Sequence, residues 1–239
     1  MPSVTRDDTA SHDVILTRVQ SFLTAGSRVP RSLFPEHVVF EQMDPGFGSV
    51  AELDPAEFDI IARAVESRQR EFAAGRACAH RALRQLGGVA QPLLVASDRS
   101  PAWPEGIVGS ISHTEGICGA AVARRDVIAG IGFDVELAIP LPLDVWPAVL
   151  TGAERSALMT MDDSERGLRA RLVFSAKEAF YKCHRSAGGG WLDFHDVELR
   201  MTADADDIEV TCDKATAMHA EGRYAIHDGV IAVGFTVPR

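Results

Sequence analysis

The chain has 239 residues, of which 46% are hydrophobic and 24% charged, and a formal net charge of -10 at pH 7. This composition is typical of a globular protein with a sizeable core and excludes a disordered chain. The negative charge argues against nonspecific nucleic-acid binding, which requires a basic surface. The sequence holds no apolar run long enough to cross a membrane, so we expect a protein that binds neither membranes nor nucleic acids.

Two further features concern the location of the protein. The amino terminus lacks a basic start followed by an apolar segment, so we expect no secretory signal and a cytoplasmic protein. The cysteines are far apart and form no CxxC spacing, which predicts reduced core thiols rather than a zinc site or a disulfide framework. They are Cys78, Cys118, Cys183 and Cys212.

The first third of the chain predicts helices. Residues 1–50 have weak periodicity, and we expect one short helix there, at 13–23. Asp54 and Pro55 mark a helix start, and a second helical pattern covers 66–86 before two glycines end it. Its predicted packing positions are Phe72, Ala79, Leu83 and Leu86. A neighbouring face carries Arg68, Arg76 and His80, which indicates either a site for a polyanion or an ordinary solvated basic face.

Three strands are predicted next, at 106–112, 117–125 and 127–137. The first two form a hairpin, and the third contains GFDVE. Because side chains alternate along a strand, Asp134 and Glu136 point to the same face. Two like charges side by side are unfavourable unless a cation lies near them. Hard oxygen ligands suit magnesium, although a solvated edge strand with two acids is the alternative.

The second half repeats this order. A proline-rich connection at 138–150 and a short helix at 151–160 precede a long helical pattern at 165–186. Lys177, Glu178 and Lys182 lie off the predicted packing face of that pattern. Strands follow at 191–201, 208–212 and 223–237. The packing positions of the long helix are Leu168, Leu172, Val173, Ala176, Ala179, Phe180 and Cys183.

These elements predict an α/β (α+β) fold made of two similar subdomains related by a pseudo-twofold axis. Each consists of a long helix packed on a mainly antiparallel three-stranded sheet. We expect the N-terminal half at 1–137 and the C-terminal half at 138–239.

Five motifs in this order resemble the 4'-phosphopantetheinyl transferases, in particular the larger type that serves siderophore, polyketide and nonribosomal peptide assembly. They are SRQREFAAGRACAHRAL, RSPAWPEGIVGSISH, GFDVE, FSAKEAFYK and WLDFHDVEL, and together they span residues 66–199. The chain departs from the family pattern at Phe133, where a smaller aliphatic residue is usual, and at His80, where arginine is common.

The resemblance implies an enzyme that transfers 4'-phosphopantetheine from coenzyme A to a serine of apo acyl or peptidyl carrier proteins, with the active site in the cleft between the two halves. The two similar halves predict a monomer, because an internal duplication can supply both sides of a cleft. It implies a magnesium site formed by Asp134, Glu136 and Glu178, and a catalytic pair formed by Lys177 and Glu178. The positions that it assigns to coenzyme A and its phosphates are Arg68, Arg76, Arg99, Ser112, His113, Asp134, Lys177 and Lys182.

Two questions stay open at this level. Glu178 can act as a metal ligand or as the base that takes the serine proton, and the two roles compete because a metal-bound carboxylate is a poor base. The alternative functions are a magnesium-dependent hydrolase of coenzyme A or another nucleotide diphosphate, and a noncatalytic coenzyme A binding module. The carrier and its docking surface are not specified by the sequence.

Overall fold

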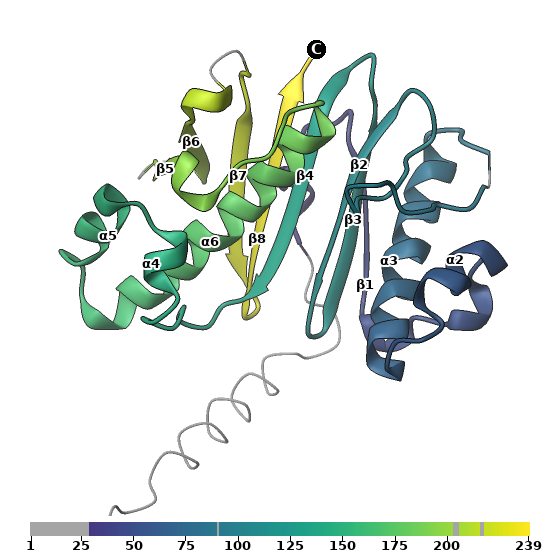
Figure 1. Cartoon of the computed structure of the whole chain (residues 1–239), viewed down its shortest axis with the longest axis horizontal. Helices are drawn as coiled ribbons and strands as arrows, with labels where there is room; N and C mark the ends of the chain where they lie inside the picture. The colour runs from purple at the N-terminus through teal and green to yellow at the C-terminus, as the bar shows by residue number, and fades with distance from the viewer. Residues whose placement is uncertain (1–28, 90, 203–205, 216–217) are drawn as a thin grey trace, which may run out of the picture.

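A computed structural model describes residues 29–239 except 90, 203–205 and 216–217. The helix expected at 13–23 lies outside this part. Two antiparallel sheets lie next to each other, and each is covered by one long helix (Figure 1). Within the described residues, no helix is both long and apolar enough to cross a membrane.

The N-terminal sheet has the strand order β1-β3-β2. Helix α3 packs on it, preceded by the shorter α2, whose first turn is closed by a capping box between Asp54 and Glu57. The bounds are β1 Val39–Met43, α2 Pro55–Ile61, α3 Glu66–Gln85, β2 Ile107–Thr114 and β3 Ile117–Arg124. The predicted helix and hairpin are therefore confirmed to within a few residues.

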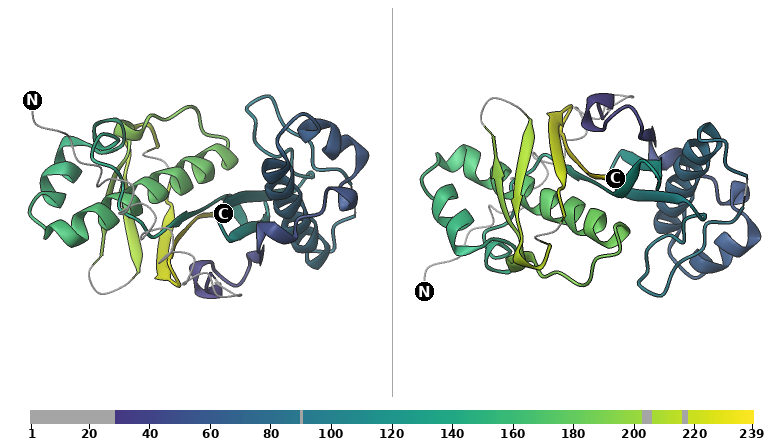
Figure 2. Two further views of the ribbon diagram at one scale, coloured as in Figure 1. Left: turned by 90° about the horizontal axis from the view of Figure 1, so that it is seen from below. Right: turned by 90° about the horizontal axis from the view of Figure 1, so that it is seen from above.

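The C-terminal sheet has the strand order β4-β8-β7-β6-β5, and α6 lies across it (Figure 2). The strands are β4 Ile128–Leu137, β5 Glu198–Met201, β6 Asp207–Thr211, β7 Glu221–His227 and β8 Val230–Pro238. The helices are α4 Trp146–Val149, α5 Gly152–Leu158 and α6 Asp163–Ser186. Short 3-10 helices are η1 Arg31–Leu33, η2 Pro45–Phe47, η3 Val50–Glu52, η4 Phe194–Asp196 and η5 Asp213–Ala215.

The predicted α+β class with antiparallel sheets is confirmed, but the strand count of the second half is wrong. That sheet has five strands because the strand predicted at 223–237 is a hairpin of β7 and β8, and because β4 pairs with β8, with Asp134 opposite Val233. The third strand of the N-terminal sheet is instead β1, in a segment whose weak periodicity predicted no strand. Local periodicity identifies a strand but carries no information about its partner. The sheets thus cross the boundary expected at residue 137, and that boundary stays a prediction.

The two sheets meet where β2 and β4 lie side by side (Figure 1). Here the side-chain hydroxyl of Ser110 on β2, rather than a backbone carbonyl, accepts a hydrogen bond from the Phe133 amide of β4 at 2.9 Å. Phe133 is fully buried and packs edge-on against Phe40, with 5.0 Å between ring centroids. Gly119 leaves room for both rings, because a Cβ there would lie 2.9 Å from each of them. The unusual Phe133 therefore forms the core between the two halves.

Helix α6 packs unusually close to β4. A Cβ built on Gly132 would lie 1.9 Å from the Ala179 carbonyl oxygen, and one on Gly130 would lie 2.8 Å from that of Cys183. Glycine is needed at both positions for the helix to approach the strand backbone. The close packing brings the face of α6 that carries Glu178 and Lys182 to the strand that carries Asp134.

Candidate functional site

Asp134 is the centre of a buried polar cluster. Its Oδ1 accepts from the Lys182 ammonium at 2.7 Å and from the Ser112 hydroxyl at 2.9 Å. Its Oδ2 accepts from the Ser175 hydroxyl at 2.8 Å. Lys182 also donates to the Phe133 carbonyl at 3.2 Å. Side chains from β2, β4 and α6 thus converge on one carboxylate that is only 4% exposed.

The other two predicted acids lie around this centre. Glu136 accepts from Arg171 of α6 at 3.2 Å. Burial and the nearby Asp134 charge raise the pKa of Glu136, against the opposing effect of Arg171. Burial also raises the pKa of Glu178, and Lys182 opposes this shift. The pKa of Glu136 is thus raised in part by Asp134 and Glu178, and the pKa of Glu178 in part by Asp134.

The chemistry of these donors fits magnesium, which prefers a small number of carboxylate oxygens. In the described residues, however, no three His, Cys, Asp or Glu side chains are gathered closely enough to hold a metal ion. Lys182 and Arg171 provide the positive charge beside Asp134 and Glu136 instead. A metal bound at Asp134 Oδ1 or at Glu136 Oε2 would have to displace Lys182 or Arg171 from that oxygen.

The structure does not bring the Lys177 ammonium to this cluster. Lys177 is 2% exposed, and its Nζ donates to Glu154 Oε2 at 2.7 Å, the Phe194 carbonyl at 2.8 Å and the Val149 carbonyl at 3.0 Å. Its predicted position off the packing face is therefore wrong, and its placement at the phosphates stays a prediction. Adjacent helical residues lie 100° apart, so Lys177 faces the core while Glu178 does not. Burial lowers the pKa of Lys177.

Arg68 and His113 come together from α3 and β2. Arg68 Nη1 contacts His113 Nε2 and lies 3.1 Å from Glu71 Oε2. Burial and the Arg68 charge lower the pKa of His113. The charges of Lys182 and Asp134 also act on the pKa of His113, so this pair lies near the Asp134 cluster.

Arg76 lies in different surroundings from Arg68. Its guanidinium is 4.4 Å from the centre of the Phe72 ring, and its Nε is 3.8 Å from Glu57 Oε1. His80 contacts the same oxygen at 2.8 Å. Burial lowers the pKa of Arg76 to about 10. The expected solvated basic face is therefore wrong for Arg76, because the small residues Ala73 and Ala74 allow this side of α3 to be buried.

A pocket of about 650 Å³ adjoins the Asp134 cluster through Lys182, which lines both. Arg99 lies on its loop wall with φ at +69°. Arg185 closes one end by an ion pair of 2.7 Å with Asp98. Three arginines and one lysine line the pocket together with aromatic residues, namely Arg99, Arg125, Arg185, Lys182, Trp103 and Tyr181. The size and the mixture of basic and aromatic groups suit a phosphorylated ligand with a ring.

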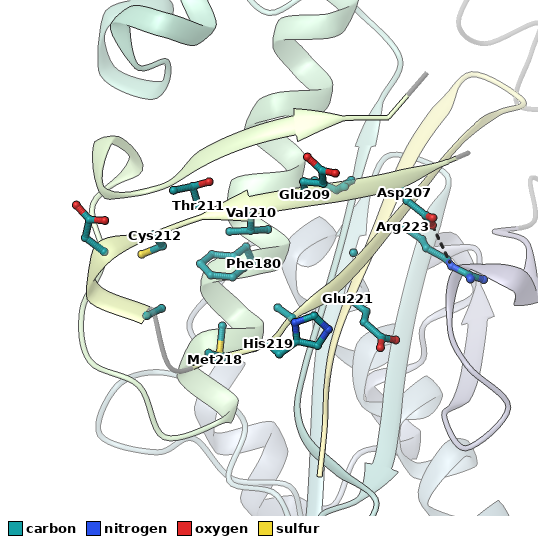
Figure 3. A pocket seen from close by; sticks show the side chains of 15 residues that line it. Phe180, Asp207, Glu209, Val210, Thr211, Cys212, Met218, His219, Glu221 and Arg223 are labelled. Atoms are coloured by element: carbon teal, nitrogen blue, oxygen red, sulfur yellow. Dashed lines mark ion pairs between the residues drawn. The ribbon is translucent and has the colours of Figure 1, made fainter. Parts of the chain in front are cut away.

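A second pocket, shown in Figure 3, lies between β6 and β7, which pair only at two positions in the described residues. Its volume is about 560 Å³. The Arg223–Asp207 ion pair of 3.3 Å lies at its edge. The Asp134 cluster contributes none of the residues that line this pocket, so we do not assign it to the candidate site.

The structure places eight of the ten predicted residues in or beside the Asp134 cluster and the adjoining pocket, and two elsewhere. Ser112, Asp134 and Lys182 are in direct contact, with Glu136 and Glu178 beside them. Arg68 and His113 form a second group, and Arg99 lines the adjoining pocket. Arg76 and Lys177 lie in separate buried clusters.

The sequence reasoning missed Ser175 and Arg171. A signal was available, because Arg171, Ser175, Glu178 and Lys182 recur at intervals of four, three and four, which places them on one face of a helix. Glu154 was also missed. Its sequence neighbourhood predicts only a helix start, and its contact with Lys177 joins distant parts of the chain.

Comparison with known proteins identifies the family. Residues 56–123 match the profile of the 4'-phosphopantetheinyl transferase N-terminal domain, and residues 130–233 match that of the 4'-phosphopantetheinyl transferase superfamily. The 4'-phosphopantetheinyl transferase Svp of Streptomyces mobaraensis is 40% identical over 177 residues, which cover 73% of this chain and 72% of the relative. The chain belongs to the 4'-phosphopantetheinyl transferase superfamily.

Two further matches are more distant. Enterobactin synthase component D of Escherichia coli is 31% identical over 157 residues, which cover 60% of this chain and 73% of the relative. A solved holo-(acyl-carrier-protein) synthase from Bacillus anthracis, in complex with coenzyme A (3',5'-ADP), is 21% identical and covers 47% of this chain and 97% of its own, with a TM-score of 0.38. The profile boundaries assign the GFDVE strand to the second domain, in agreement with its pairing to β8.

Proposed function

We propose that this protein transfers 4'-phosphopantetheine from coenzyme A to a serine hydroxyl of an apo acyl or peptidyl carrier protein and releases adenosine 3',5'-bisphosphate. The membership in the superfamily supports this reaction, and the names of the relatives do not support a hydrolase. The observation that carries the proposal is the Lys182–Asp134–Ser112 contact at the edge of a basic pocket.

Coenzyme A carries phosphates at two places, and the described residues offer cations at two places. The pocket of about 650 Å³ presents Arg99, Arg185 and Lys182, with Tyr181 and Trp103 as surfaces for a base. The Arg68–His113 pair provides a second cationic position beside Ser112. Arginine suits such phosphate contacts because its fork can make two hydrogen bonds at once.

The transfer needs a serine proton acceptor and neutralisation of charge on the phosphate that leaves. Lys182 is the cation that can reach such a phosphate, because it is part-exposed and lines the pocket. Glu178 is the candidate base, because burial raises its pKa and so its affinity for a proton. General-base assistance typically contributes about 10²–10⁴-fold.

Asp134, Glu136 and Glu178 would hold a magnesium ion, and binding of the ion by Glu178 would compete with its role as the base. When bound, the ion supplies positive charge for the diphosphate oxygens. The protein side chains orient the reactants, since Ser112 and Ser175 fix the Asp134 carboxylate through both of its oxygens. We further propose a cytoplasmic monomer that binds neither membranes nor nucleic acids.

The test is intact-mass analysis of apo carrier proteins incubated with this protein, coenzyme A and magnesium. The native protein should add the mass of one phosphopantetheine group. The Glu178→Gln variant should be nearly inactive, whereas Glu209→Gln, on β6 away from the cluster, should retain activity. Consumption of coenzyme A with every carrier in a panel unmodified would overturn the proposal in favour of hydrolysis.

A further inference from the structure

Lys177 is a buried lysine whose ammonium is completely satisfied. The Nζ atom has three protons and three oxygen acceptors, all within 3.0 Å. The acceptors belong to the end of α4, to α5 and to η4. Lys182 also has three oxygen acceptors, but two of them lie at 3.2 Å and its side chain is 29% exposed. Lys177 is only 2% exposed, so its three donors are both used and shielded from a substrate phosphate.

Its partner Glu154 is satisfied to the same degree. Oε2 accepts from Lys177 at 2.7 Å and from the Thr151 amide at 2.8 Å, and Oε1 accepts from the Leu199 amide at 3.0 Å. Glu154 is 6% exposed. The pair therefore ties α6 to the N-terminus of α5 and to the start of β5 through one buried charge pair.

The position of this pair relative to the site is informative. Lys177 directly precedes Glu178, and the Phe194 carbonyl that it holds belongs to the opposite wall of a pocket of about 130 Å³. Glu178, Tyr181 and Trp191 line the same pocket. The ring of Phe194 also stacks on Phe174 of α6, with 5.8 Å between centroids. Lys177 thus fixes the distance between the helix that carries Glu178 and the segment facing it.

We propose that Lys177 and Glu154 are positioning residues that hold Glu178 and the Trp191–Phe194 wall in their working arrangement, and that Lys177 does not contact the substrate. This role rests on the proposed transferase function. Lys182, five residues further along α6, is the lysine that faces the ligand pocket.

The experiment compares four variants with the native protein. Lys177→Met leaves the Glu154 carboxylate buried without its partner, whereas Glu154→Gln with Lys177→Met removes both charges and keeps an acceptor oxygen for one of the two backbone amides. The third variant is Glu154→Gln alone, and the fourth is Lys182→Met as the contrast. Tm, the Kd of coenzyme A by calorimetry, and kcat at 20 °C are measured for each.

Lys177→Met should lower Tm by about 10 °C, because breaking a buried pair strands a charge. Its kcat should fall about 10–100-fold through misplacement of Glu178, while the Kd of coenzyme A stays within about twofold. The double variant should recover most of the Tm and most of the kcat that Lys177→Met loses. Glu154→Gln alone should lower kcat by about fivefold. Lys182→Met should instead weaken coenzyme A binding.

Two results would overturn the proposal. A double variant that regains stability but stays inactive and binds coenzyme A weakly would make Lys177 a substrate contact. If kcat is unchanged in the folded variants of Lys177 and Glu154, the pair only stabilises the fold. If the other variants do not fold, the kcat of Glu154→Gln alone decides this question. A native protein that modifies no carrier would refute the proposed transferase function. The comparisons of Tm and of the Kd of coenzyme A need no carrier, so they would still decide whether Lys177 contacts coenzyme A.

Discussion

The close packing of α6 on β4 makes a sharp prediction for Gly132→Ala. The added Cβ would lie 1.9 Å from the Ala179 carbonyl oxygen and 2.6 Å from the Cys183 amide nitrogen, whereas ordinary contacts begin at 3.4 Å. Both neighbours are backbone atoms of a helix, so neither can rotate away. The strand and the helix would therefore have to separate by about 1.5 Å, the difference between the observed and ordinary distances.

We expect this separation to cost about 3 kcal/mol of unfolding free energy, the upper part of the usual range for an overpacked core. For a chain of this length, that loss corresponds to a fall in Tm of about 6–12 °C. The hydrogen bond of 3.2 Å between Lys182 and the Phe133 carbonyl crosses the same interface. A shift of this size would break that bond and move Lys182 relative to Asp134, so turnover should fall as well.

Chemical denaturation and the carrier-modification assay measure the two effects. Gly152→Ala is the matched control, because a Cβ there meets none of the described residues within 4 Å and the position is the first residue of α5. It should be neutral or stabilising by about 0.4–1 kcal/mol. Equal stability of Gly132→Ala and Gly152→Ala would refute the close-packing argument, and normal turnover in a destabilised Gly132→Ala would refute its link to the site.

Three further predictions concern charged groups. Lys182→Met should reduce turnover about 100-fold, measured by carrier modification, and should lower Tm less than Lys177→Met does, because Asp134 keeps two hydroxyl donors. The depressed pKa of His113 means that the unfolded state binds its proton more readily, so stability should fall as pH drops below about 6.5, and His113→Gln should flatten that slope in denaturation experiments. Chelation of divalent cations should stop turnover and magnesium restore it, with a higher magnesium requirement for Glu136→Gln, measured by titration.

Much of the fold follows from local pattern. The period of α3 and α6, the glycines after α3 and the hairpin of β2 and β3 are all encoded in neighbouring residues, and the structure confirms them. The pairing of β4 with β8 is different. It joins Asp134 to a residue about a hundred positions further along the chain, and nothing in the alternation of either strand identifies the other.

The buried polar residues show the same limit more clearly. Arg76 and Lys177 have the side chains of surface residues, and on a helix they would ordinarily be placed in solvent. Each is buried because a glutamate from another element, Glu57 or Glu154, lies against it. The contacts that make their burial tolerable are long-range, so periodicity within α3 or α6 cannot predict it.

The two lysines of α6 illustrate what would have resolved the ambiguity. Lys177 and Lys182 are five residues apart, which turns them about 140° from each other on the helix, so only one can face the strand that carries Asp134. The hydrophobicity of the two side chains is the same, so it does not predict which lysine faces that strand. The glycines of β4 do, because a helix can approach a strand this closely only where Cβ atoms are absent, and Gly130 and Gly132 lie against Ala179 and Cys183. Lys182 directly precedes Cys183, and that packing brings it to Asp134, whereas Lys177 is left on the side of α5, where Glu154 meets it.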